Sequence, residues 1–345
     1  MKLNETPIRT SRNFGINNIT LDNIEIPDFI KVFDNIDVTR EYSEIDKNVS
    51  VKPLVYGTGS ILEENTQKNG NSKLNINVTK KDNIEIVYEF DEDNTVLVNQ
   101  IDINANADCN IIIQYKSNTD LECFHNGILK VTAQNNANVN VCILNFLNDK
   151  SNNFESIQNE CYENSNLQYT IIDIGGKNSI SNYYSNVVGE KAKNVLKTIY
   201  LANNNEVKDL NYIVDVRGEK SEVDIDVQGA IDGEAKKHFK GTIDFKKGCT
   251  KSKGSENEYC MLLSNKAKSI ALPMLLCTED DVEGNHSTAS GKVDNKELFY
   301  IMSRGLRYKE AIKLIVKARF NNILARIKDE ELRNEIIKKI DGRLN

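Results

Sequence analysis

Apolar and polar residues alternate along much of the chain between residues 73 and 290. This alternation is typical of β-strands that have one buried face and one polar face. The clearest examples are residues 74–78, 84–90, 101–104, 139–143, 223–227 and 242–245. Short segments rich in Asn, Asp, Gly and Lys separate them and favour turns. Because amphipathic helix patterns are nearly missing here, the pattern predicts a long, purely β region.

Such a region folds as a sandwich, a barrel, a propeller or a β-solenoid. The segment contains no strict repeat, which disfavours a propeller. Connections of variable length with recurrent Asn suit an irregular β-helix whose coils stack on one another. The residues alone leave the choice between a β-helix and a sandwich open.

The period changes to a helical one at Asp294. Residues 296–302 read as a short helix that ends at Gly305. A longer helix is expected from Tyr308, and a third from Asp329, both with apolar residues at helical spacing.

Charge supports a division of the chain into parts. The whole chain carries a formal charge of −7, but residues 301–345 hold 12 Lys and Arg against 6 Asp and Glu, which leaves a net charge of −13 for the rest. The basic end is either a solvated helix surface or a surface that docks onto an acidic partner. We predict an N-terminal extension (1–72, partly irregular), a β core (73–290) and a C-terminal helical domain (291–345).

Composition excludes several classes of protein. The acidic balance argues against a general nucleic-acid binder. No apolar run approaches the length of a transmembrane helix, and the first residues lack the apolar run of a secretory signal, so we expect a cytoplasmic protein without a membrane partner. The cysteines are odd in number and never at CxxC spacing, which predicts ordinary thiols rather than a disulfide framework, a zinc site or a complete iron–sulfur site in this chain alone. They are Cys109, Cys123, Cys142, Cys161, Cys249, Cys260 and Cys277.

One segment resembles a known family. Residues 281–294, followed by 297–300 and 303–305, are similar to the C-terminal signature of the SufB/SufD family, which comprises subunits of the cytosolic iron–sulfur cluster assembly scaffold. Further similarity covers residues 239–243, the stretch from 262 to Pro273, and the N-terminal Pro7, Ile8, Arg9, Thr10, Arg12, Gly15 and Asn17.

The resemblance implies a mainly β fold, a right-handed parallel β-helix core with a C-terminal α-helical domain. It also implies a non-catalytic scaffold subunit that pairs with a SufB-like subunit through the β-helix and recruits a SufC-like ATPase through the helices. The chain has no GxxxxGK[ST] phosphate loop, so a partner would have to hydrolyse ATP.

Three departures favour a SufD-like member. Ala267 stands where SufB-type chains carry their cluster-assembly Cys, Ser287 replaces the Glu that follows the shared His, and Gly284 replaces a frequent Cys. His286 is retained. Imidazole ligates iron, so the resemblance implies that His286 offers a ligand to a transient iron–sulfur cluster at the subunit interface, with no stably bound cofactor. Alternatively, His286 is a polar turn residue that caps the β-helix.

The resemblance also directs attention to the first helices as the docking surface for the ATPase. The candidate contacts are Leu298, Tyr300, Arg304, Arg307 and Tyr308. His125 and His238 read as structural residues, and Asp280, Asp281 and Glu283 as a solvated turn between the last strand and the first helix.

Two other functions stay open. One is a homodimeric, SufB-type scaffold, against which Ala267 speaks. The other is a β-helical carbohydrate-active enzyme, which is disfavoured because the chain has no Trp to stack on a sugar. The sequence does not distinguish a homodimer from a heterodimer.

Overall fold

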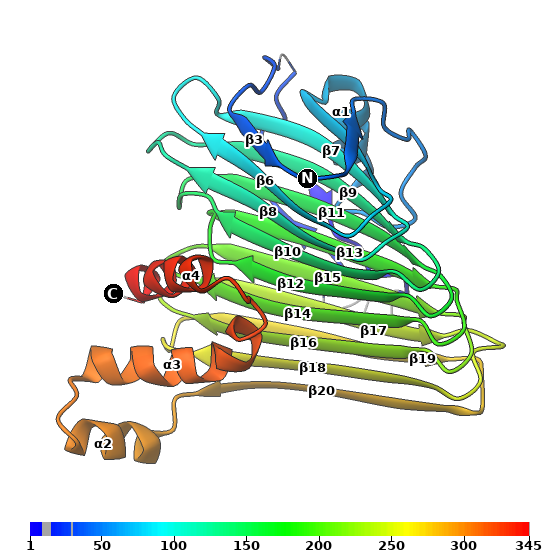
Figure 1. Cartoon of the computed structure of the whole chain (residues 1–345). Helices are drawn as coiled ribbons and strands as arrows, with labels where there is room; N and C mark the ends of the chain where they lie inside the picture. The colour runs from blue at the N-terminus through cyan, green and yellow to red at the C-terminus, as the bar shows by residue number, and fades with distance from the viewer. Residues whose placement is uncertain (9–14, 29, 345) are drawn as a thin grey trace.

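The computed structural model describes residues 1–8, 15–28 and 30–344, so Arg9, Thr10 and Arg12 of the N-terminal resemblance lie outside the described residues. Two nine-stranded sheets face each other, and from β5 onward the chain passes from one sheet to the other with each strand (Figure 1). In the described residues, β5 to β20 form a parallel solenoid of about eight turns. The predicted β-helix with C-terminal helices is therefore confirmed, and the sandwich is wrong.

Sheet I contains the even-numbered strands from β6 to β20, together with β3, in the order β20-β18-β16-β14-β12-β10-β8-β6-β3. Their bounds are β3 Ile36–Thr39, β6 Asp82–Phe90, β8 Cys109–Ser117, β10 Asn138–Phe146, β12 Asn166–Asp173, β14 Lys193–Ala202, β16 Glu222–Ile231, β18 Ser252–Leu262 and β20 Val282–Lys292.

Sheet II contains the odd-numbered strands from β5 to β19, together with β4, in the order β19-β17-β15-β13-β11-β9-β7-β5-β4. Their bounds are β4 Glu44–Asp46, β5 Ser72–Val78, β7 Val96–Ala105, β9 Phe124–Ala133, β11 Asn152–Cys161, β13 Asn178–Val187, β15 Val207–Val216, β17 Lys236–Phe245 and β19 Lys268–Cys277.

The two ends of the solenoid differ. At the N-terminal end, β3 pairs antiparallel with β6 and β4 pairs antiparallel with β5, so short strands close both sheets. Helix α1 (Ser60–Asn69) contacts β7 and β9, and the small β1–β2 pair (Lys2–Leu3 and Ile19–Thr20) shares an apolar cluster with residues of β7, β9, β11 and β13. At the C-terminal end, β19 and β20 are the last strands of their sheets.

The predicted alternation produces the solenoid interior. Inward-facing apolar side chains of successive coils form one continuous core. Aromatic rings stack along it: Tyr169, Tyr183, Tyr212 and Phe239 follow one another edge to face, with ring centroids 5.2–6.0 Å apart. Such contacts add to the free energy gained by burying the rings.

Polar side chains share this interior along one register of sheet II. His125, Asn153, Ser179, Lys208 and Lys237 are successive partners in the parallel ladder. Their polar atoms are paired inside the solenoid. The His125 Nδ1 lies 2.6 Å from the Asn153 side-chain oxygen, and the Asn153 amide donates to Ser179 Oγ at 2.9 Å. Burial without such partners would cost free energy.

The C-terminal helices begin close to the predicted residues: α2 is Asn295–Ser303, α3 is Tyr308–Leu324 and α4 is Glu330–Arg343. The Asp294 and Asp329 side chains cap α2 and α4 by accepting hydrogen bonds from backbone N–H groups. Helix α3 packs on the outer face of β14 and β16 through a second apolar cluster that includes Ile315 and Phe320.

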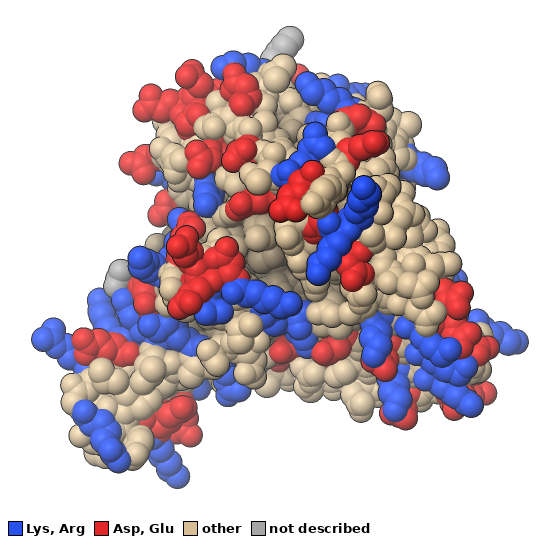
Figure 2. Space-filling model, in the orientation of Figure 1, with Lys and Arg blue, Asp and Glu red and all other residues tan. Residues whose placement is uncertain are grey.

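Several of the basic residues in this region serve to attach the helices. Arg319 lies 4.2 Å from the ring centroid of Tyr259, Arg326 donates to Gln168, and Arg343 pairs with Glu206. These cations face the solenoid, so only part of the positive charge of residues 301–345 is free to meet a partner. Figure 2 shows Lys and Arg over the helical region, mixed with Asp and Glu.

Glu155 makes the stability of the solenoid depend on pH. Burial raises the pKa of this carboxyl to about 8, against an opposing hydrogen bond from Tyr115. The folded chain therefore holds a proton that the unfolded chain loses above about pH 4.5, and the free energy of unfolding should fall as pH rises from about 4.5 to about 8. We expect Glu155→Gln to make this fall shallower, as measured by urea unfolding at pH 5, 6.5 and 8. Identical pH slopes in both proteins would contradict it.

Candidate functional site: the C-terminal end of the solenoid

The last coil of the solenoid has no further coil stacked on it in the part of the chain that the structure describes. Most of β20 is exposed, and β19 is half-buried along most of its length. β20 pairs with β18 on one edge, and its other edge has no strand partner among the described residues. A long exposed edge is a template for pairing with another chain, which proteins normally block. The end of the solenoid is therefore a candidate interaction surface.

His286 lies on this last strand. The interpretation of His286 as a turn residue is wrong, because residues 282–292 form a strand. The acidic segment is likewise not a turn before a helix: Asp280 and Asp281 lie between β19 and β20, and Glu283 is in β20. The error arose because β20 is exposed on both faces, so its sequence lacks the alternation of a half-buried strand.

Register sets the surroundings of His286. In the parallel ladder His286 is the partner of Glu256 on β18, and Glu258 and Cys260 follow on the same face. His286 is exposed at the end, whereas Glu256 one strand below is fully buried. The end of the solenoid thus has an accessible imidazole above a buried carboxyl.

Glu256 and Glu258 differ in their hydrogen bonds. Glu258 Oε1 accepts from Lys237 Nζ at 2.8 Å and from the Tyr200 hydroxyl at 2.9 Å. Neither oxygen of Glu256 has a hydrogen-bond partner among the described residues. Burial, helped by the nearby charge of Glu258, raises the pKa of Glu256 to about 8. A buried ion pair and an unpaired buried carboxyl therefore lie side by side beneath the last coil.

The remaining histidines and cysteines lie elsewhere. His125 is buried among Asn side chains, and burial lowers its pKa to about 4, whereas His238 lies on the outer face of sheet II, 3.5 Å from Asp209. Six cysteines are buried or half-buried, and Cys277 is exposed. Within the described ranges, no three His, Cys, Asp or Glu side chains are grouped so as to hold a metal ion.

The predicted ATPase contacts lie on α2 and at the start of α3. Tyr300, Arg304, Arg307 and Tyr308 are exposed, while Leu298 is half-buried and packs toward the helical core. Arg304 donates to the Tyr300 hydroxyl at 2.9 Å and lies over its ring. The sequence reasoning did not single out Phe299, whose side chain is 74 % exposed. Only the folded helix shows that this ring points away from the core.

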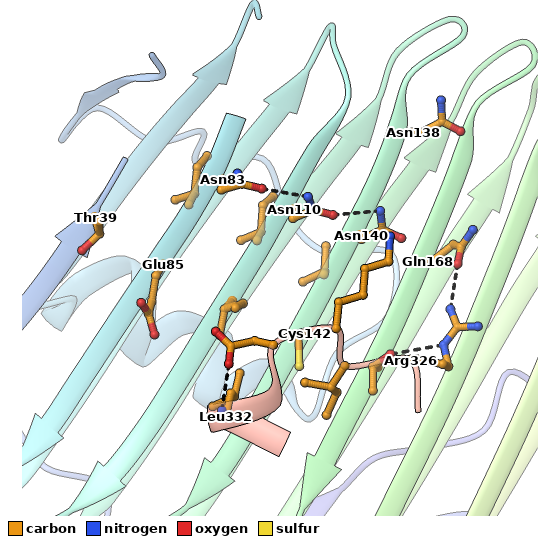
Figure 3. Close-up of a pocket in the computed structure, with 18 of the residues that line it drawn as sticks. Thr39, Asn83, Glu85, Asn110, Asn138, Asn140, Cys142, Gln168, Arg326 and Leu332 are labelled. Carbon is orange, nitrogen blue, oxygen red and sulfur yellow. Dashed lines mark hydrogen bonds between the residues drawn. The ribbon is translucent and has the colours of Figure 1, made fainter. Parts of the chain in front are cut away.

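The sequence also gave no sign of a cleft of about 740 Å³ between sheet I and the α3–α4 loop. Its floor carries a ladder of amides: Asn110 donates to Asn83, Asn140 donates to Asn110, and Arg326 reaches Gln168 from the loop (Figure 3). In Figure 2 the surface is hollowed beside this loop. The ladder forms because β6, β8, β10 and β12 place these residues in one register.

Comparison with known proteins gives a family for this architecture. A family model described as "SUF system FeS cluster assembly, SufBD core domain" matches residues 88–319, about two thirds of the chain. The match includes the terminal coil, α2 and most of α3.

Three curated proteins show similarity over different lengths. "Iron-sulfur cluster assembly protein SufD" of Bacillus subtilis is 23% identical over 78% of this chain and 62% of its own length. The protein of the same name from Escherichia coli is 27% identical over 31% of this chain and 25% of its own. An iron–sulfur cluster assembly SufBD family protein of Pyrococcus horikoshii is 45% identical over 19% of this chain and 15% of its own.

The chain thus spans less than two thirds of the length of these relatives. None of the helices among the described residues is long and apolar enough to cross a membrane.

The ion pair beneath the last coil yields a stability prediction. Both Lys237 and Glu258 are fully buried, so Lys237→Met should leave an uncompensated charge and lower the free energy of unfolding by roughly 3–5 kcal/mol. The double variant Lys237→Met/Glu258→Gln removes both charges and should recover much of this loss. Chemical denaturation of the single and double variants checks it; equal losses in the two would contradict the prediction.

Proposed function

The chain belongs to the SufBD family, and we propose that it is a non-catalytic scaffold subunit in iron–sulfur cluster assembly. The observation that carries the proposal is the uncovered terminal coil, with His286 on its last strand, inside the region that matches the family. The names of the SufD relatives support the same role. The assignment to a multi-subunit complex goes beyond these names and is part of the proposal.

The terminal coil pairs with another β-helix in this proposal. The partner is a SufB-like subunit or a second copy of this chain. The free edge of β20 offers backbone groups for strand addition, and the half-buried residues of β19 offer apolar surface. Iron and sulfide are the cargo of the complex, and His286 would face them at the junction between the two chains.

The α2 surface is the docking site for a SufC-like ATPase. Phe299, Tyr300 and Tyr308 are exposed aromatic residues, and Arg304 adds a cation beside them. Exposed aromatic residues and Arg are the side chains that most often dominate binding energy at interfaces. These exposed side chains are not members of the apolar cluster that packs the helices on the solenoid, so partner binding at this surface leaves the contact with the solenoid intact.

Docking at α2 predicts that a charged residue at position 299 prevents the ATPase from co-purifying with this chain. When the chain is co-expressed with a SufC-like ATPase and a SufB-like subunit, Phe299→Asp should lower ATPase recovery about tenfold or more, because a charge replaces an apolar anchor. Val51→Asp is the matched control: Val51 is exposed to 75 %, similar to Phe299, but it lies near the N-terminal end. Equal recovery in both variants would contradict docking at α2.

Substitution of His286 should change the amount of iron and sulfide that the complex binds. His286→Ala should leave the complex intact, because the side chain is exposed and makes no contact needed for folding, but should lower the iron and sulfide bound by the anaerobically purified complex. His238→Ala, on the outer face of sheet II, is the control. An unchanged iron content in His286→Ala would contradict the assignment of His286 to the site. Failure of the unaltered chain to form a complex would contradict the scaffold proposal.

A further inference from the structure

Glu256 is the buried side chain whose state the fold leaves unexplained. It is 0 % exposed, and neither carboxylate oxygen has a hydrogen-bond partner among the described residues. Buried carboxyls are normally hydrogen-bonded, ion-paired or bound to a metal. Glu258, two residues along the same face, shows the ordinary solution, because it takes both Lys237 and Tyr200. Lys237 is thus already paired with Glu258, and the Glu256 carboxyl has no such pairing among the described residues.

Glu256 lies directly next to His286 in the parallel ladder. The parallel ladder pairs it with His286, and paired residues of adjacent parallel strands lie on the same face, with the strands about 4.8 Å apart. The imidazole and the carboxyl therefore occupy adjacent levels at the end of the solenoid. The level of His286 is exposed and open to a partner or a ligand, whereas the level of Glu256 beneath it is buried.

The opposite sheet leaves room for the carboxylate. A Cβ atom on Gly241 of β17 would lie 2.1 Å from Glu256 Oε1, so only glycine at 241 allows the carboxylate its present place. The fold thus accommodates the buried acid by removing a side chain across from it. This space lies directly beneath the last coil, on the level of Glu256.

We propose that Glu256 is a second iron ligand of this chain, which together with His286 binds a divalent first-row cation at the end of the solenoid. A neutral imidazole and a carboxylate suit iron(II), cobalt(II) and zinc. The remaining coordination positions are filled by water, or by ligands from the paired subunit. This inference rests on the proposed function, because it places iron at the surface where the subunits pair.

Cobalt(II) is the probe for this site, since its d–d absorption reports ligation without any need for cluster assembly. The full chain is titrated with cobalt(II), and calorimetry gives the affinity. Loss of an outer-shell partner already weakens metal sites about 10–100-fold, so Glu256→Gln and His286→Ala should each weaken cobalt binding at least about tenfold. Zinc competition should displace the bound cobalt.

The chain offers a matched control in Glu155→Gln. Glu155 is also a buried interior glutamate, and its Oε2 also has no hydrogen-bond partner among the described residues, although it lies 3.9 Å from His125 Nε2. Burial raises its pKa to about 8, as it does for Glu256, but Glu155 lies on β11, coils away from the end. Glu155→Gln should bind cobalt like the unaltered chain. Circular dichroism on all variants verifies that they are folded.

Each result decides the proposal. Binding by Glu256→Gln equal to that of the unaltered chain would overturn it, as would no cobalt binding by the unaltered chain. If the subunits and the ATPase still co-purify in that case, the scaffold function stands and only the ligand assignment fails. Weakened binding in Glu256→Gln and His286→Ala, but not in Glu155→Gln, supports it.

Discussion

Parallel register is the constraint on which the rest of this molecule depends. Each inward side chain is covered by its partner in the coil before and by its partner in the coil after, so a residue type that suits one level suits a column of levels. The aromatic column through Tyr183 and Tyr212 and the polar column from His125 to Lys237 both follow from this rule. Among the described residues, a side chain in the final coil has a ladder partner on one side only, which leaves the end of the solenoid open to other molecules.

The same rule explains why charges can enter the interior. A lysine in one column meets a carboxylate from the facing sheet, as Lys208 meets Asp173 at 2.7 Å and Lys237 meets Glu258. Fixed pairs of this kind add little net stability, but they penalise any shift of register, because a one-residue slip would bury charges without partners. In a fold made of similar coils, that penalty helps to select one alignment.

The sequence was most informative where one face of an element is buried. The alternation around Ile84–Phe90 and Val223–Val227 matches strands β6 and β16, and the spacing from Ile312 to Leu324 matches the buried face of α3. The sequence pattern did not indicate strand β20, which has no buried face in the isolated chain. It also did not indicate that the ring of Phe299 is exposed. The pairing of Glu256 with His286 and the amide ladder of the cleft depend on register between coils, which no local pattern contains.

The closed N-terminal end has a consequence for assembly size. β3 and β4 run antiparallel to the strands that they cover and are short, so neither offers the next parallel coil a surface to continue on. In the proposed pairing, each chain therefore has only its C-terminal end available for stacking along the solenoid axis. If two chains pair end to end as proposed, both free ends are used, and the array would stop at a pair instead of growing into a filament.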